Sequence, residues 1–317
     1  MLSRTAENLY WIARYIERAE TNARLLEVGA RNALMPNTGG GYRNDWESVL
    51  QATGTAGGFG EKYSDIVQRN VETYLFFDRD NPNSVASCIE KARENGRIVR
   101  TALTGQVWDA LNTAFQEVQD FGRVERSRLS LSDLTDWTLR TTALVRGAAL
   151  NTQLRNDGYD FTNIGHYLER ADSTARMLDV KYFTLLPQLS YVGSGLDNYQ
   201  WRTLLRAMSS SRAFNWAYGG EISPPKIVDF LVLNRQCPRS LTSAIEGADF
   251  HLERLARSYG KPGPAQTKVR EMVGELSDMQ VQDVFDEGLH EFLSRMIGNV
   301  AALGGEVQEM YLSGDVR

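Results

Sequence analysis

The sequence predicts an all-α fold, a helical bundle built from two sequence-related halves. Only 8 prolines occur in 317 residues, and long segments contain neither proline nor glycine, which favours helices over a sheet with frequent turns. Apolar residues recur at spacings of three and four, the period of an amphipathic helix. A third observation, an internal repeat, divides the chain in two.

The repeat starts inside the first expected helix. Residues 15–28 align without gaps on residues 167–180, and every replacement keeps the polarity of the side chain. A second block, residues 78–92, is similar to residues 234–248 at nearly the same offset. Between these blocks, Trp46, Leu50 and Ala52 match Trp201, Leu205 and Ala207. Three blocks in the same order indicate an ancient duplication.

The repeat, together with glycine and proline as stops, defines the expected elements. We predict a first helical repeat over residues 1–156 and a second over 157–317, packed as one unit around the two helices that carry the repeated Glu-Arg motif. In the first half, helices are expected at residues 3–35, 44–54, 63–77, 83–102, 106–120 and 131–154. In the second half, they are expected at residues 160–186, 199–212, 224–234, 238–257, 266–283 and 285–312. Pro82 and Pro238 are each expected in the first turn of a helix, and residues 54–60 in a glycine-rich connector.

Composition excludes several classes of protein. The formal net charge of -5, from 35 Lys and Arg against 40 Asp and Glu, argues against nucleic acid as a partner, because nucleic-acid binders carry a basic surface. No apolar run reaches the roughly 20 residues that span a bilayer, so no membrane partner is expected. Only Cys88 and Cys237 occur, and the chain opens without an apolar leader, so we expect a reducing cytoplasm.

Charged residues follow one edge of the apolar stripe on the repeated helix. Glu17, Glu20 and Arg24 lie at spacings of three and four, and the second half recreates this ladder. If the two helices meet, the ladders lie together near the middle of the protein, where Arg24 and Arg176 offer bidentate partners to buried carboxylates. Two interpretations stay open, an ion-pair network that fixes helix register and a polar pocket for a carboxylate- or amine-bearing peptide end. The candidate residues are Glu17, Arg18, Glu20, Arg24, Glu169, Arg170, Asp172 and Arg176.

Other chemistries find little support in the sequence. A carboxylate metal centre in a helical bundle uses Glu-x-x-His, but here only His166-x-x-Glu169 comes close, in reversed order, and Arg14 replaces the histidine in the first half. His251 and His290 have no serine or cysteine in a nucleophile motif near them. We therefore expect no metal and no cofactor, and we assign no catalytic residue.

The opening residues 2–20, and the repeated Glu17-Arg18 and Glu169-Arg170, resemble the signature of the bacterial alpha-E family. The resemblance covers nearly the whole chain and implies an all-helical protein. Such proteins are typically encoded beside a circularly permuted ATP-grasp amide ligase and a transglutaminase-like cysteine peptidase, sometimes with a proteasome-like peptidase. The resemblance therefore implies a place in peptide synthesis or tagging, with that ligase and possibly the peptidase as partners.

Two functions follow as expectations. The first is a non-catalytic helical partner of an ATP-grasp ligase, which helps to hold a peptide or amino-acid ligand, because the sequence contains no complete catalytic constellation. The second is an enzyme that acts on a peptide or amino-acid amide, with the twin acidic ladders as general acid and base. Paired carboxylates can act in this way when burial and a like charge raise the pKa of one of them.

Overall fold

The computed structural model describes residues 1–34, 41–185 and 195–313, and it describes side chains for 1–34, 45–181 and 197–313. Every regular element within these residues is helical, so the predicted all-α fold is confirmed. None of the helices in the described ranges combines the length and the apolar character that crossing a membrane requires.

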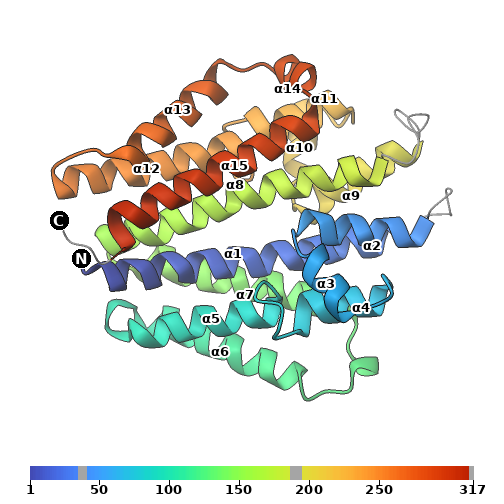
Figure 1. Cartoon of the computed structure of the whole chain (residues 1–317), viewed down its shortest axis with the longest axis horizontal. Coiled ribbons are helices and arrows are strands. Elements are labelled where there is room, and N and C mark those ends of the chain that lie inside the picture. Colours follow the sequence, from blue (N-terminus) through green and yellow to red (C-terminus); the bar gives the residue numbers. More distant parts are fainter. Residues whose placement is uncertain (35–40, 186–194, 314–317) are drawn as a thin grey trace.

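Two long helices, α1 (Ser3–Asn32) and α8 (Asp157–Leu185), run side by side through the middle of the molecule (Figure 1). On one side, α5 (Val85–Ile98) and α7 (Leu131–Thr152) pack against α1, and α6 (Gly105–Phe121) covers them. On the other side, α12 (Leu241–Tyr259) and α15 (Leu289–Val307) pack against α8, and α13 (Pro264–Asp278) covers them. The remaining helices are α2 (Gly41–Ala52), α3 (Ala56–Lys62), α4 (Gln68–Glu72), α9 (Gly195–Ala207), α10 (Ser211–Tyr218), α11 (Pro224–Val228) and α14 (Val281–Glu287).

Elements follow one another in a similar order on both sides of residue 156. A turn of π-helix, Thr73–Phe77 after α4 and Asp229–Leu233 after α11, precedes a polar turn and then the helix that packs on α1 or α8. A third π-helical turn, Gln308–Leu312, extends α15, and short 3-10 turns occur at Arg100–Ala102 and Arg126–Arg128. The predicted boundary falls directly before α8, while the duplication itself stays a prediction.

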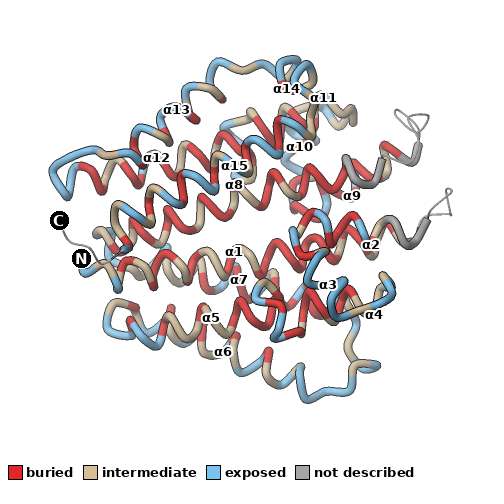
Figure 2. The backbone as a smooth tube through the Cα atoms, viewed as in Figure 1, coloured by how far each residue is buried: buried red, intermediate tan, exposed pale blue. Residues whose placement is uncertain are grey.

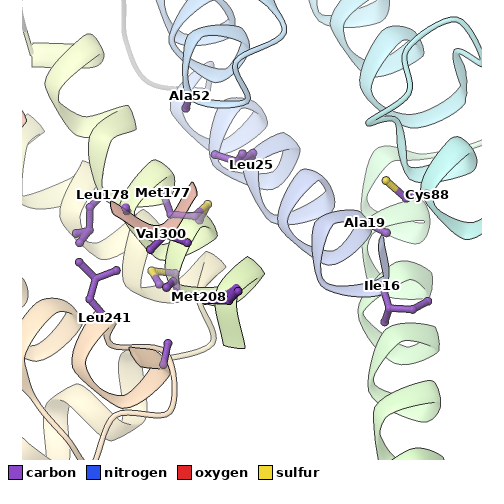
Figure 3. Packing of buried hydrophobic residues seen from close by; sticks show 14 of the residues in the cluster. Ile16, Ala19, Leu25, Ala52, Cys88, Met177, Leu178, Met208, Leu241 and Val300 are labelled. Atoms are coloured by element: carbon purple, nitrogen blue, oxygen red, sulfur yellow. The ribbon is translucent and has the colours of Figure 1, made fainter. Parts of the chain in front are cut away.

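The core lies around the two central helices. Figure 2 shows buried residues concentrated along α1 and α8, with exposed residues on the outer faces of α6 and α13. Figure 3 shows small side chains such as Ala19 and Cys88 where α1 meets α5. Both side chains have no exposed surface, and such small residues allow helix backbones to approach closely. Burial raises the pKa of the Cys88 thiol to about 12.

The structure corrects several details of the expected elements. Helix α10 (Ser211–Tyr218) lies mostly beyond the helix expected at residues 199–212. The glycine-rich connector at 54–60 contains α3, which is held by Phe59, whose ring stacks on Tyr63 at 4.9 Å and meets Tyr74 edge-on at 5.4 Å. Aromatic packing therefore outweighs the poor helix propensity of three glycines. The helix expected over 266–283 stops at Asp278, because a new helix cap forms at Gln280.

The two prolines lie in turns that precede the helices, rather than in the first helical turn. Helix α5 begins at Val85 and α12 at Leu241. Ser84 Oγ accepts a hydrogen bond from Ser87 N at 3.1 Å, and Ser240 Oγ accepts one from Ser243 N at 3.0 Å. A serine N-cap satisfies backbone N–H groups that the helix leaves free, so these serines, and not the prolines, start the helices.

Candidate functional site

The repeated Glu-Arg motifs meet where α1 crosses α8. Arg170 donates to Glu17 through Nε to Oε1 and Nη2 to Oε2, both at 3.0 Å. Arg18 donates to Glu169 through Nε to Oε1 at 2.6 Å and Nη2 to Oε2 at 3.0 Å. Each half therefore supplies the guanidinium that binds the carboxylate of the other half, in the bidentate geometry that Arg favours.

A direct hydrogen bond lies between the two exchanged pairs. Thr21 Oγ1 donates to Ser173 Oγ at 2.7 Å, and both side chains are buried. Position 21 of the first half aligns with position 173 of the second. The hydrogen bond thus joins equivalent positions of the two halves. Such a contact is expected where a pseudo-two-fold axis relates α1 to α8.

The Glu17 carboxylate lies in a larger ion-pair cluster with Glu20. Arg146 of α7 donates to both carboxylates, through Nη1 to Glu17 and Nη2 to Glu20. Arg239, in the turn before α12, donates to Glu20 and places Nη1 3.5 Å from Glu17 Oε1. Arg24 donates to Glu20 at 2.9 Å through Nε and 2.6 Å through Nη2. We call this group, with Arg170 and His166, the Glu17 centre.

The Glu169 carboxylate has a smaller set of partners, which we call the Glu169 centre. Arg14 Nε donates to Glu169 Oε2 at 2.6 Å, and its Nη1 donates to Tyr10 Oη at 2.8 Å. The same guanidinium carbon lies 5.2 Å from the centre of the Trp11 ring, a cation-π contact. Arg18, the second partner, also donates to Asn83 Oδ1 at 2.9 Å. Each positive charge here has a further polar or aromatic contact.

The arginines keep the motif carboxylates ionised. Burial on its own would raise the pKa of Glu17, but Arg170 and the other cations around it hold this pKa well below the ordinary value. Burial would likewise raise the pKa of Glu169, and Arg14 and Arg18 lower it. Neither carboxylate therefore carries a proton to donate near neutral pH.

The ladder of the second half lies differently from that of the first. Arg176 Nε donates to Asp172 at 2.7 Å, but these side chains are 31% and 19% exposed. Glu20 and Arg24 form the equivalent pair, and they are 1% and 8% exposed. The two ladders therefore do not meet as equal rows. The ion pairs between α1 and α8 are made by Arg14, Arg18 and Arg170 instead of Arg24 and Arg176.

A cavity of about 430 Å³ opens beside the Glu17 centre, between α1, α7 and α8. Arg146, Arg170, Arg239 and His166 line one part of its wall. The other lining residues are Leu9, Ile12, Ala13, Ile16, Leu103, Val107, Val145, Ala149, Leu150, Gln153, Tyr159, Thr162, Asn163, Tyr167, Pro238 and Ser243. Its size and mixed lining are typical of small-molecule sites. A smaller cavity, about 170 Å³, adjoins Arg18 and Glu169.

His166 is the only histidine among the residues that line the larger cavity. Its Nδ1 lies 3.4 Å from Glu17 Oε2. Burial and the neighbouring Arg170 lower the pKa of His166 to about 3, so the imidazole is neutral at physiological pH. His251 and His290 lie elsewhere and contact Asp160 and Asp179, each at 2.7 Å.

Sequence reasoning missed the residues that distinguish the two centres. Arg239 occupies the turn position that aligns with Asn83, and this unequal pair was the available signal. Arg14 aligns with His166, a second unequal pair, whereas Arg146 lies on α7, outside the repeated blocks. Within the ranges that the structure describes, no three His, Cys, Asp or Glu side chains gather as a metal site would require.

The fold and the site define a class of all-helical protein in which two Glu-Arg motifs exchange partners at a helix crossing. Residues 1–312 match the family model "Alpha-E", described as a predicted alpha-helical domain with a conserved ER motif. The chain therefore belongs to the Alpha-E family.

Curated relatives come from mycobacteria. An uncharacterized protein of Mycobacterium bovis and one of Mycobacterium tuberculosis strain CDC 1551 are each 25% identical to the chain over 318 aligned residues. A second Mycobacterium tuberculosis protein, from strain H37Rv and also uncharacterized, is 24% identical. The alignments cover 94% of this chain and 35% of each relative, so the chain spans about a third of their length. No solved structure matches.

Proposed function

We propose that the chain is a non-catalytic helical partner of an ATP-grasp-type amide ligase, with a role in peptide synthesis or tagging. The observation that carries this proposal is the state of the motif carboxylates. Glu17 and Glu169 are buried, bound by arginines from the other half, and have lowered pKa values. Such groups fix a geometry and bind, but they are poor general acids and bases.

The class of partner comes from the family context. The resemblance to alpha-E proteins implies a circularly permuted ATP-grasp ligase as a neighbour, with a transglutaminase-like peptidase as a second candidate. In the mycobacterial relatives the matched region is about a third of a longer polypeptide. That arrangement supports a role next to a second protein unit. Covalent linkage in one polypeptide keeps two units at high effective concentration, and binding of a separate subunit can serve the same purpose.

The first experiment is a pull-down of the tagged chain from its source cells in mild salt, followed by mass spectrometry. We expect an ATP-grasp ligase in near-equal amount. The recovered ligase is then assayed for ADP release and for ligated product, with and without the chain. We expect both rates to rise when the chain is added. Recovery of the chain alone, or ligation that ignores it, would contradict the proposal.

A pair of matched variants asks whether the motif contributes. Glu17→Ala with Glu169→Ala removes both motif carboxylates, and Glu94→Ala with Glu125→Ala removes two exposed ones, 41% and 71% exposed. Both double variants are compared for ligase binding and ligation after circular dichroism has established that they are folded. We expect loss only in the motif variant. Full binding and activity there would exclude a role for the motif.

A second candidate is an enzyme acting on a peptide or amino-acid amide, and one observation favours it. Neutral His166 lines the larger cavity and its Nδ1 lies 3.4 Å from Glu17 Oε2, so a carboxylate orients an imidazole beside the space in which a substrate would bind. The isolated chain is incubated with a panel of peptide amides and free amine release is measured. Turnover that falls in His166→Asn but not in His290→Asn supports this candidate. Absence of turnover in the wild-type chain excludes it for the panel.

A further inference from the structure

The Glu17 centre contains more positive than negative charge. Four arginines contact its two carboxylates, and each makes at least one ion pair with Glu17 or Glu20. His166 adds no charge, because its pKa is lowered to about 3. Within the described residues these arginines form ion pairs with no other acidic side chain, so the positive charges outnumber the two carboxylates by two. The arginines are Arg24, Arg146, Arg170 and Arg239.

The excess charge is largely hidden from water. The side chain of Arg239 is 15% exposed, and that of Arg170 is 11% exposed. Burial lowers the pKa of Arg239 to about 10, assisted by Arg24 and Arg170, and Glu20 and Glu17 oppose this only in part. Arg170 in the same centre and Arg14 in the Glu169 centre show the opposite direction, because in spite of burial Glu17 and Glu169 raise their pKa values above the ordinary value. The Glu169 centre has one positive charge more than its single carboxylate, whereas the Glu17 centre has two more than its carboxylates and places three of its arginines on the cavity wall.

The excess charge faces the larger cavity. Arg146, Arg170 and Arg239 are the arginines that line it, whereas Arg24 lies on the far side of the carboxylates and contacts Ala207 and Ser209. Desolvated cations without full compensation are costly, and a guanidinium presents donors in a fork that fits a carboxylate. An anionic group entering the cavity would meet these donors and reduce the imbalance.

The other residues that line the cavity indicate which chemical groups the anionic ligand carries. Most of the wall is apolar, formed by α1, α6 and α7 side chains such as Ile12, Val107 and Val145. Amide and hydroxyl side chains are interspersed among these, namely Gln153, Thr162, Asn163 and Ser243. Thr162 Oγ1 and Asn163 Nδ2 already donate to backbone carbonyls of α8. A plain hydrocarbon chain would offer no partner to Gln153 and Ser243, whereas peptide N–H and C=O groups can pair with them.

We propose that this cavity binds the free C-terminal carboxylate of a short peptide with apolar side chains, the carboxylate on the Arg146, Arg170 and Arg239 side and the peptide body along the apolar wall. The proposal goes beyond the proposed function, because it assigns a ligand class to a named cavity. It holds whether or not a ligase is the partner, and its test uses the chain alone. Failure here is therefore distinguishable from failure of the pull-down.

The test is isothermal titration calorimetry with the acetylated tripeptide of leucine, alanine and leucine, as the free acid and as the C-terminal amide. We expect saturable binding of the acid, with a Kd at least tenfold below that of the amide. Octanoate and inorganic phosphate are titrated in parallel, and both are expected to bind at least tenfold more weakly than the acid. Equal binding of the amide overturns the proposal, equal binding of octanoate makes the ligand a fatty acid, and equal binding of phosphate makes the cavity an unspecific anion site. Absence of saturable binding by the acid also overturns it.

Variants locate the binding site. Arg239→Gln removes one excess charge while Arg170 still pairs with Glu17, and we expect at least tenfold weaker binding of the free acid. Arg126→Gln is the matched control, because it breaks a part-buried ion pair with Glu72 outside this cavity, and it should leave the Kd within twofold. Ala149→Phe reduces the cavity volume without touching an arginine, so it tests the site independently if Arg239→Gln fails to fold. Unchanged binding in both Arg239→Gln and Ala149→Phe overturns the proposal.

Discussion

The Glu17 and Glu169 centres carry the same motif in different surroundings. At the Glu169 centre, Arg14 and Arg18 bind one carboxylate and are held further by Tyr10, Trp11 and Asn83. Gly304 of α15 faces Arg14, because a Cβ at this position would lie 3.4 Å from Arg14 Nη1. A glycine has no side chain, so α15 adds no charge at this point. Two arginines there share one carboxylate, so the positive charge exceeds the negative charge by one.

At the Glu17 centre, the same exchange of partners is enlarged. His166 stands at the position that aligns with Arg14, and Arg239 at the position that aligns with Asn83. Arg146, from the helix packed on α1, contacts both carboxylates. Two arginines around one carboxylate at the Glu169 centre thus become four arginines around two carboxylates at the Glu17 centre, beside a cavity. The difference teaches that one motif can fix the helix crossing on one side and offer a binding site on the other.

The largest expected effect comes from removing a motif carboxylate. Glu17→Ala and Glu169→Ala each leave buried arginines without their main partner, so we expect a loss of about 3–5 kcal/mol in the free energy of unfolding. Glu94→Ala, at an exposed position, should lose less than about 1 kcal/mol. Urea denaturation measures all three, and losses below 1 kcal/mol at both motif sites would show that the exchanged pairs contribute little.

A double-mutant cycle distinguishes the two centres more sharply. Glu169 has two arginine partners, whereas Glu17 shares its interactions among Arg170, Arg146 and Arg239. Loss of one arginine is therefore better compensated at Glu17. With Arg to Met and Glu to Gln substitutions, we expect a coupling free energy of about 1–3 kcal/mol for Arg18 with Glu169 and a smaller one for Arg170 with Glu17. The reverse order contradicts our comparison.

Stability should fall in acid at both centres, over different ranges. The pKa values of Glu17 and Glu169 are depressed in the folded state, so their contribution is present above the unfolded value near about 4.3 and is lost as pH falls further. His166 has a folded pKa of about 3 against roughly 6.5 unfolded. Between these two pKa values His166 is protonated in the unfolded chain and neutral in the folded chain. The free energy of unfolding therefore drops by roughly 1 kcal/mol per pH unit as the pH falls below about 6.

The measurement is the free energy of unfolding from urea titrations at several values of pH. His166→Asn should flatten the curve between about pH 6 and 4, because it removes the group that titrates in that range. His290→Asn is the control, since His290 lies outside the cavity and pairs with Asp179. Equal flattening by both variants would assign the slope to a general effect of histidine removal.

The smallest effect concerns the serine caps that hold the two unequal turns. Ser84 follows Asn83, and Ser240 follows Arg239. Each Ser to Ala substitution should lower the free energy of unfolding by about 1 kcal/mol, as urea denaturation will measure. Only Ser240→Ala should also weaken peptide binding, because only its turn carries an arginine to the cavity. An equal effect of Ser84→Ala on binding would refute this distinction.

Much of the fold was predictable because the helices carry regular apolar spacing and the repeat marks equivalent elements. The missed helices, α3 and α10, depend on aromatic contacts with residues far along the chain, such as Phe59 with Tyr74 and Phe214 with Phe230. Local propensity at Gly57 and Gly58 points the other way. These two helices depend on tertiary packing, which the local sequence pattern does not reveal.

The candidate site was predicted in composition more than in geometry. Glu17, Glu20 and Glu169 are buried and paired, but spacing on one helix could not show that Arg18 and Arg170 reach across to the other. Arg146 joins the centre from α7, about 130 residues along the chain from Glu17. Contacts between distant segments depend on helix packing, which is why the cavity and its excess charge were not predictable from either motif alone.

The exchange of partners at the crossing of α1 and α8 also sets how the chain can be divided. A fragment ending before α8 would present Glu17 and Arg18 on an open surface, without Arg170 and Glu169 to bind them. Two copies of that fragment hold the complementary groups for one another, since Glu17 of each can take Arg18 of the other. If the chain is split at residue 156, we therefore expect the two fragments to bind one another through these ion pairs. Each fragment alone carries both a glutamate and an arginine of the motif, so we expect it to form a homodimer.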